Sequence, residues 1–204
     1  MGARTLLDGN WVIVSAALGL LGSCRYAYAT MRGRVRPNRV TWFLWAAAPL
    51  IAFSAQLDAG VGTPAILTLA SGTGPLIVVT ASFASRHGTA KITAFDLFCG
   101  AVSVVALAVW LGLGAASWAV LFAVAADGAA AVPTIRKAWR DPSSENALFY
   151  VLVGIGATIT LLTITTWEPA SWLFAGYMLA ISLLLTTIIT AQRAAERTEE
   201  RPAD

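Results

Sequence analysis

Apolar blocks, each near 20 residues long, alternate with short polar segments along the whole chain. Hydrophobic residues make up 57% of the 204 residues and charged residues only 12%. A helix needs about 20 apolar residues to cross a hydrocarbon layer of about 30 Å, and a helix satisfies its backbone polar groups there internally. The pattern predicts an all-α, polytopic protein of the cell membrane with seven transmembrane helices.

The predicted spans cover about residues 10–30, 40–57, 63–84, 92–113, 115–135, 147–166 and 171–191. Arginine and lysine gather after spans one, three, five and seven, whereas the other loops carry only Asp58 and Glu168. Because basic loops stay in the cytoplasm, the N-terminus is predicted outside and the C-terminus inside. The formal charge of +3 then reports topology, and it gives no support for a nucleic-acid partner.

Breaker and aromatic residues recur when spans one to three are laid on spans five to seven at an offset of 105 residues. The matched pairs are Pro37 with Pro142, Trp45 with Tyr150, Pro49 with Gly154, and Pro64 with Pro169. Two parallel repeats of three helices require one extra span to turn the chain around between them. The predicted organisation is a three-helix bundle over 1–84, a linker helix over 85–114, a second bundle over 115–191 and a cytoplasmic tail over 192–204.

A segment that closes the fifth span reads Pro133-Thr134-Ile135-Arg136-Lys137, and Pro142-Ser143-Ser144 follows it. This segment resembles the second signature of the PQ-loop superfamily, which contains the SWEET sugar transporters. Thr134 stands where that family has glutamine, and the first repeat has Arg25-Tyr26-Ala27-Tyr28 where a Pro-Gln pair would be sought. The resemblance implies two three-helix bundles that move a small polar solute by alternating access.

Asp127 is the acidic residue in the middle of the fifth span, roughly 13 Å along the helix from Trp118. A carboxylate at that depth costs about 2.5 to 3.5 kcal/mol to insert, so it is rarely left without a partner or a task. We expect Asp127 to be either a substrate or proton-coupling site, or half of a structural ion pair. Arg25 is the expected partner, because the resembling fold places the first helices of its two bundles face to face. Alternatively, Arg25 extends to the inner membrane surface.

Other residues are candidates for the walls and hinges of a solute path. Trp45 and Tyr150 would form aromatic walls at mid-depth, or simply pack between helices. Hydrogen bonds to a polar solute, or to neighbouring helices, are expected from Gln56, Thr73 and Tyr177. The candidate hinges are Pro49, Pro75, Pro133 and Gly154, and the run from Ser71 to Pro75 is expected to loosen or break the third helix.

Three functions remain open at this level. A carrier for a small solute, with Asp127 as the candidate for proton coupling, accounts for the repeat, the mid-depth acid and the prolines. A non-transporting receptor or assembly subunit would use the same helices, and self-association is open for either. An enzyme is not expected, because no nucleophile and base constellation is evident. With His87 as the single histidine and two cysteines in apolar spans, no metal site or cofactor is predicted.

Overall fold

The computed structural model describes residues 6–58, 65–87, 90–113, 116–164, 167 and 169–199. Within these ranges the chain forms seven α-helices and one short 3₁₀ helix, with no strand. The helices are α1 (Trp11–Met31), α2 (Arg39–Asp58), α3 (Ala65–Ala84), α4 (Ala94–Leu113), α5 (Ala116–Arg140), α6 (Ala147–Thr163) and α7 (Pro169–Glu199), and η1 (Pro142–Ser144) lies between α5 and α6. The all-α class is therefore confirmed, with one helix for each predicted span.

Two helices extend past their predicted ends. α5 continues through Pro133 and the basic residues to Arg140, and α7 continues through most of the charged tail to Glu199. Lysine and arginine are good helix formers, and they suit the last turn of a helix because its C-terminus carries partial negative charge. The polar loop between α5 and α6 is thus shorter than predicted.

By length and apolarity, fewer helices qualify as membrane spans than the seven that the sequence predicts. In the described part of the chain, the stretches Trp11–Met31 and Trp172–Thr198 are long and apolar enough to cross a membrane. The apolar stretches Thr68–Ala84, Ala94–Val109 and Ala147–Thr163 are shorter. Crossing by all seven helices therefore stays a prediction.

The predicted break in the third helix is wrong, because α3 is continuous through Ser71 and Pro75. Instead, the glycines of α3 allow it to pack closely against its neighbours. A Cβ on Gly72 would lie 2.7 Å from Leu50 of α2, and one on Gly74 would lie 2.5 Å from the Ser23 hydroxyl of α1. The two glycines let α3 lie close against both neighbours, and this close contact compensates for the poor helix propensity of glycine.

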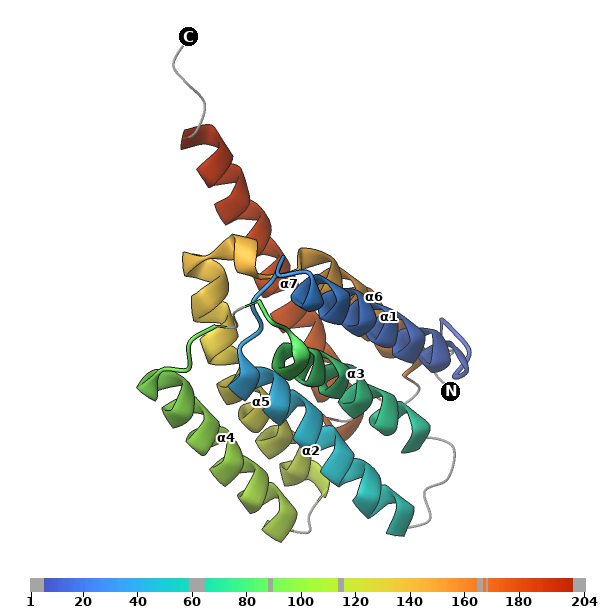
Figure 1. The fold of residues 1–204 in the computed structure, drawn as a ribbon. Helices are drawn as coiled ribbons and strands as arrows, with labels where there is room; N and C mark the ends of the chain where they lie inside the picture. The colour runs from blue at the N-terminus through green and yellow to red at the C-terminus, as the bar shows by residue number, and fades with distance from the viewer. Residues whose placement is uncertain are drawn as a thin grey trace.

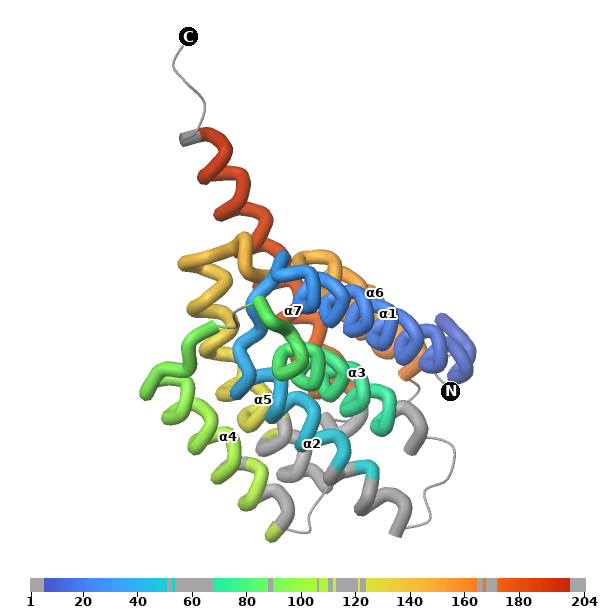
Figure 2. The backbone as a smooth tube through the Cα atoms, viewed as in Figure 1, coloured from blue at the N-terminus to red at the C-terminus, as the bar shows by residue number. Residues whose placement is uncertain are grey.

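We divide six of the helices, in chain order, into two groups of three, α1 to α3 and α5 to α7, whose arrangement can be followed in Figures 1 and 2. α3 packs against both α1 and α2, and α7 packs against both α5 and α6. Between the groups, α1 packs against α6 and α2 packs against α5, while α4 lies on α5 and α2. In each group the third helix contacts the other two, and the first helix contacts the second helix of the other group.

The loops that follow α1, α3 and α5 meet at one end of the bundle, which we call the basic end (residues 32–38, 85–87 and 141–146), and the basic last turns of α5 lie beside it. There the Ser85 hydroxyl donates to the carbonyl of Thr30 at 3.1 Å, and Arg39 donates to the carbonyl of Ser82 at 2.7 Å. At the opposite end, the Leu7 amide donates to the carbonyl of Leu162 at 3.3 Å. The C-terminal part of α7 extends beyond the other helices (Figure 1).

Candidate functional site

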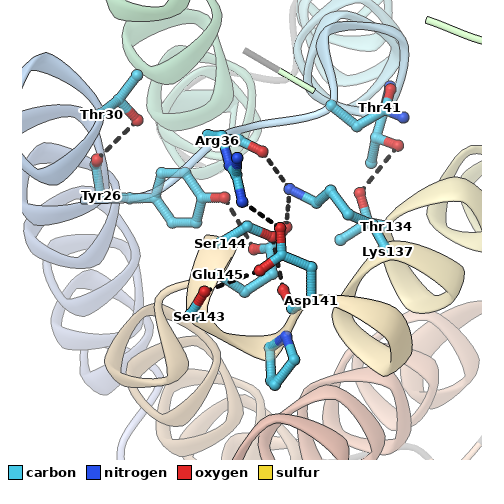
Figure 3. Close-up of polar contacts among 12 residues, drawn as sticks. Tyr26, Thr30, Arg36, Thr41, Thr134, Lys137, Asp141, Ser143, Ser144 and Glu145 are labelled. Carbon is cyan, nitrogen blue, oxygen red and sulfur yellow. Dashed lines mark hydrogen bonds and ion pairs between the residues drawn. The ribbon is translucent and has the colours of Figure 1, made fainter. Parts of the chain in front are cut away.

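Glu145 lies at the centre of a polar cluster at the basic end, and its side chain is fully buried (Figure 3). The hydroxyls of Tyr26 and Tyr150 both donate to Oε2, at 2.8 and 2.9 Å. Lys137 Nζ forms an ion pair with Oε1. One carboxylate therefore joins α1, α5 and α6, and its charge is matched by a lysine that is itself only 13% exposed.

The same cluster ties the loop after α1 to the loop after α5. Lys137 Nζ also donates to the carbonyl of Arg36, and the Arg36 amide donates to the carbonyl of Ser144 at 2.8 Å. The Arg36 guanidinium forms an ion pair with Asp141, a residue 105 positions further along the chain (Figure 3). The loops of the two helix groups are thus joined by backbone hydrogen bonds and by charge.

Local sequence explains the turn at η1 that precedes the buried Glu145. Pro142 suits the first position of a helix because it has no amide hydrogen to satisfy, and Ser144 Oγ donates to the Asp141 carbonyl at 2.7 Å. Asn146 then caps α6 by accepting from the Leu148 amide at 3.1 Å. Arg193 of α7 donates to the carbonyl of Glu145 at 2.6 Å, so an arginine satisfies the backbone of this turn.

Aromatic rings pack on the apolar side of this cluster. The Trp42 ring centroid lies 4.6 Å from that of Tyr26, 5.0 Å from that of Phe149 and 5.4 Å from that of Trp45, and the centroids of Phe149 and Tyr150 are 5.0 Å apart. Trp45 and Tyr150, predicted as walls of one pocket, belong to one aromatic cluster. Neither is among the residues that line the two cavities described below, and their role as walls of a solute path stays a prediction.

Asp127 lies near the middle of α5 and faces three other helices. The Tyr177 hydroxyl of α7 donates to Oδ2 at 2.6 Å. The Trp45 side chain of α2 lies beside the same carboxylate, and its Nε1 is buried with no hydrogen-bond partner among the described residues. Asp127 also lines a cavity of about 10 Å³ with Ser103 of α4, which is room for about one water.

The predicted ion pair between Asp127 and Arg25 does not form. α1 packs against α3 and α6 and makes no contact with α5 in the described part of the chain. Arg25 is instead exposed at the basic end, where it lines a cavity of about 180 Å³ together with Glu145 and Arg193. The long arginine side chain reaches this end from within the apolar helix, which is the alternative that the sequence left open.

The remaining predicted residues are spread through the helices. Thr73 Oγ1 donates within α3, to the carbonyl of Leu69 at 2.7 Å, and the side chain of Gln56 lies outside the described residues. The candidate hinges Pro49, Pro75 and Pro133 lie inside continuous helices. A Cβ on Gly154 would lie 3.3 Å from Ser182 of α7, so this glycine allows α6 and α7 to pack closely.

The cluster around Glu145 was not predicted, because in the sequence Lys137 and Glu145 read as ordinary loop charges. One usable signal exists: Glu145 is an acid that follows a basic segment and lies two residues before an apolar helix. No group of three or more metal-binding side chains is found among the described residues. No family model matches this chain, and comparisons with curated proteins and with solved structures find no match either.

Proposed function

We propose that this chain is a seven-span carrier of the cell membrane that moves a small polar solute by alternating access. The arrangement of the helices supports this proposal. Two groups of three helices, each with its third helix in contact with the other two, match the organisation that the resemblance to the PQ-loop superfamily implies. The basic loops gathered at one end fit a cytoplasmic face.

The observation that carries the proposal is the position of the Asp127 carboxylate and its hydrogen bonding. Its carboxylate lies at half-height among α2, α4, α5 and α7, with one hydroxyl donor and beside a cavity. No ion-pair partner for it is found within the described part of the chain. A structural acid is usually paired inside a membrane, whereas an acid with free hydrogen-bonding capacity is available to a solute or a proton.

In this proposal, contacts at the basic end keep the solute path closed toward the cytoplasm. The two helix groups are connected by the ion pair of Arg36 with Asp141, by the hydrogen bond from Lys137 to the Arg36 carbonyl and by that from Tyr26 to Glu145. Opening toward the cytoplasm requires these loops to separate, and water can replace the lost contacts of the exposed pair at little cost. Opening would also separate Tyr26 of α1 from Glu145, whereas Lys137 and Tyr150 belong to the same group as Glu145 and would move with it.

The test begins with ligand discovery on the purified protein. A thermal-shift screen against sugars, amino acids, nucleosides and vitamins should give at least one hit, since a ligand at a hundred times its dissociation constant stabilises by about 2.7 kcal/mol. Liposomes holding the protein should then accumulate that ligand, with faster uptake when the pH outside is lower than inside. Binding without flux would favour the non-transporting receptor or assembly subunit.

Asp127→Asn isolates the role of the acid. The variant should lose pH-driven uptake and keep exchange of labelled for unlabelled solute, because asparagine keeps the volume and hydrogen bonding of the site. Glu196→Gln, an exposed position on α7, is the matched control and should transport as the wild type does. Equal pH-driven uptake by Asp127→Asn and wild type would reject Asp127 as the coupling site.

A further inference from the structure

The cavity of about 180 Å³ at the basic end is lined by three arginines, Arg25, Arg34 and Arg193. Glu145 is the one acidic residue among the lining residues, and its carboxylate is already held by Lys137 and by two tyrosine hydroxyls. Lys137 offsets the charge of Glu145. The cavity is therefore lined by three arginines with no unpaired carboxylate among the lining residues.

The arginines differ in how they are held. Arg193 is fixed by hydrogen bonds from Nε and Nη2 to the carbonyl of Pro142, at 3.2 and 3.0 Å, and from Nη2 to that of Glu145. The side chains of Arg25 and Arg34 are exposed and make no hydrogen bond or ion pair with any described residue. One guanidinium is thus preorganised, and two are free to close on a ligand.

A helix N-terminus adds to the positive potential. Asn146, which caps α6, also lines the cavity, and its Oδ1 is occupied by the Leu148 amide. The side-chain amide of Asn146 is left as a donor, and the first turn of α6 contributes the positive end of its dipole. The cavity therefore offers several donors and no uncommitted carboxylate among its lining residues.

We propose that this cavity binds a phosphate group, either as a free phosphate anion or as the headgroup of an anionic phospholipid. Guanidinium groups match the oxygens of a phosphate in pairs, and a dianion or monoanion relieves the repulsion among three like charges. Arg25 lies six residues before the end of α1, roughly 9 Å along the helix, so its head reaches the level of the loops. The site does not depend on transport and would exist in a non-transporting protein.

The test uses the full chain, purified in a neutral detergent and washed free of anionic lipid. Inorganic phosphate is titrated at constant ionic strength while thermal stability is followed, and phosphatidylglycerol or phosphatidylcholine is added in a second series with bound lipid counted by native mass spectrometry. Saturable stabilisation by phosphate ions identifies a free anion as the ligand. Saturable retention of phosphatidylglycerol alone identifies a lipid headgroup.

Variants decide whether the arginines are responsible. Arg25→Gln and Arg34→Gln should each weaken binding at least about tenfold, because each removes charge-assisted hydrogen bonds. Arg193 is left unchanged because it also holds the backbone of the turn. Arg140→Gln, which removes an exposed charge that does not line the cavity, should bind as the wild type does. The proposal is overturned if neither ligand binds saturably, or if Arg140→Gln loses as much affinity as the cavity variants.

Discussion

Two acidic side chains inside the helical bundle are held in opposite ways. Glu145 has a lysine and two tyrosine hydroxyls as partners, whereas among the described residues Asp127 accepts one hydrogen bond, from Tyr177, and has no ion-pair partner. A fully partnered acid fixes the positions of the elements that it joins, because removing any partner leaves buried polar groups unsatisfied. We therefore interpret Glu145 as structural and Asp127 as functional.

Replacing Glu145 with glutamine should destabilise the protein strongly. The variant leaves the largely buried Lys137 ammonium without its counter-charge, and breaking a buried ion pair costs about 3 to 5 kcal/mol. Chemical unfolding of the detergent-solubilised protein, followed by tryptophan fluorescence, measures the loss. The double variant Glu145→Gln with Lys137→Met should recover part of it, because no unpaired charge is then buried.

Asp141→Asn is the comparison for that experiment. It removes the exposed ion pair with Arg36, whose side chain is 52% exposed, and such pairs contribute about 0 to 1 kcal/mol. Equal losses for Glu145→Gln and Asp141→Asn would contradict the assignment of Glu145 as the central buried residue of this end.

Tyr177→Phe tests the hydrogen bond that Tyr177 donates to Asp127. Loss of a hydrogen bond to a charged acceptor should lower the free energy of unfolding by about 1.5 to 3 kcal/mol. The same change in an Asp127→Asn background should cost less, so a double-mutant cycle gives a nonzero interaction energy. Tyr28→Phe, at an exposed ring, serves as the control and should have little effect. An additive cycle would mean that the hydroxyl and the carboxylate do not interact.

At the scale of whole helices, the sequence predicted correctly which segments are helical. It predicted less well where α5 and α7 end and what the glycines of α3 do. Apolar blocks locate α1 to α7 because each must bury or shield about 20 residues of backbone. Charges in the last turns of α5 and α7 read as loop, yet they are compatible with helix. Gly72 and Gly74 read as breakers because only the positions of Leu50 and Ser23 reveal that they are contact points.

Gly74→Ala should test this packing role. A methyl group would lie 2.5 Å from the Ser23 hydroxyl, and overpacking of this kind costs about 1 to 3 kcal/mol. Shortening the neighbour in the double variant Gly74→Ala with Ser23→Gly should restore part of the loss, as judged by melting temperature. Gly19→Ala on α1, where no atom lies within 4 Å of the added carbon, should be neutral or slightly stabilising. Equal effects at both positions would contradict the contact between α1 and α3 at Gly74.

The site was less accessible to sequence reasoning than the helices. Asp127 stands out because a charge in the middle of an apolar block is costly wherever the block folds. Its partner could not be derived in the same way, since the choice between Arg25 and Tyr177 depends on which helices are neighbours. Glu145 gains its role only when Tyr26, which is 119 residues away in the chain, is placed beside it.

For the whole molecule, the contacts between the two helix groups have the form expected for parallel repeats. The first helix of each group meets the second helix of the other, and Arg36 pairs with the residue 105 positions later. Residues at matched places in two repeats meet only near the axis that relates them. The repeat remains a prediction, and it requires that every helix cross the membrane in alternating directions.

Cysteine accessibility distinguishes seven crossings from two. If only α1 and α7 crossed, residues 32–167 would lie on one side of the membrane and both termini on the other. With seven crossings, Trp167 lies outside with the N-terminus, and Ser143 and Thr198 lie inside.

Single cysteines are placed at Gly9, Ser143, Trp167 and Thr198 in a background with Cys24→Ser and Cys99→Ala, and intact cells are treated with a membrane-impermeant maleimide. Seven crossings predict labelling of Gly9→Cys and Trp167→Cys alone, with the other two labelled only after permeabilisation. Labelling of Thr198→Cys in intact cells, with Trp167→Cys protected, would establish the two-span arrangement and remove the carrier proposed above.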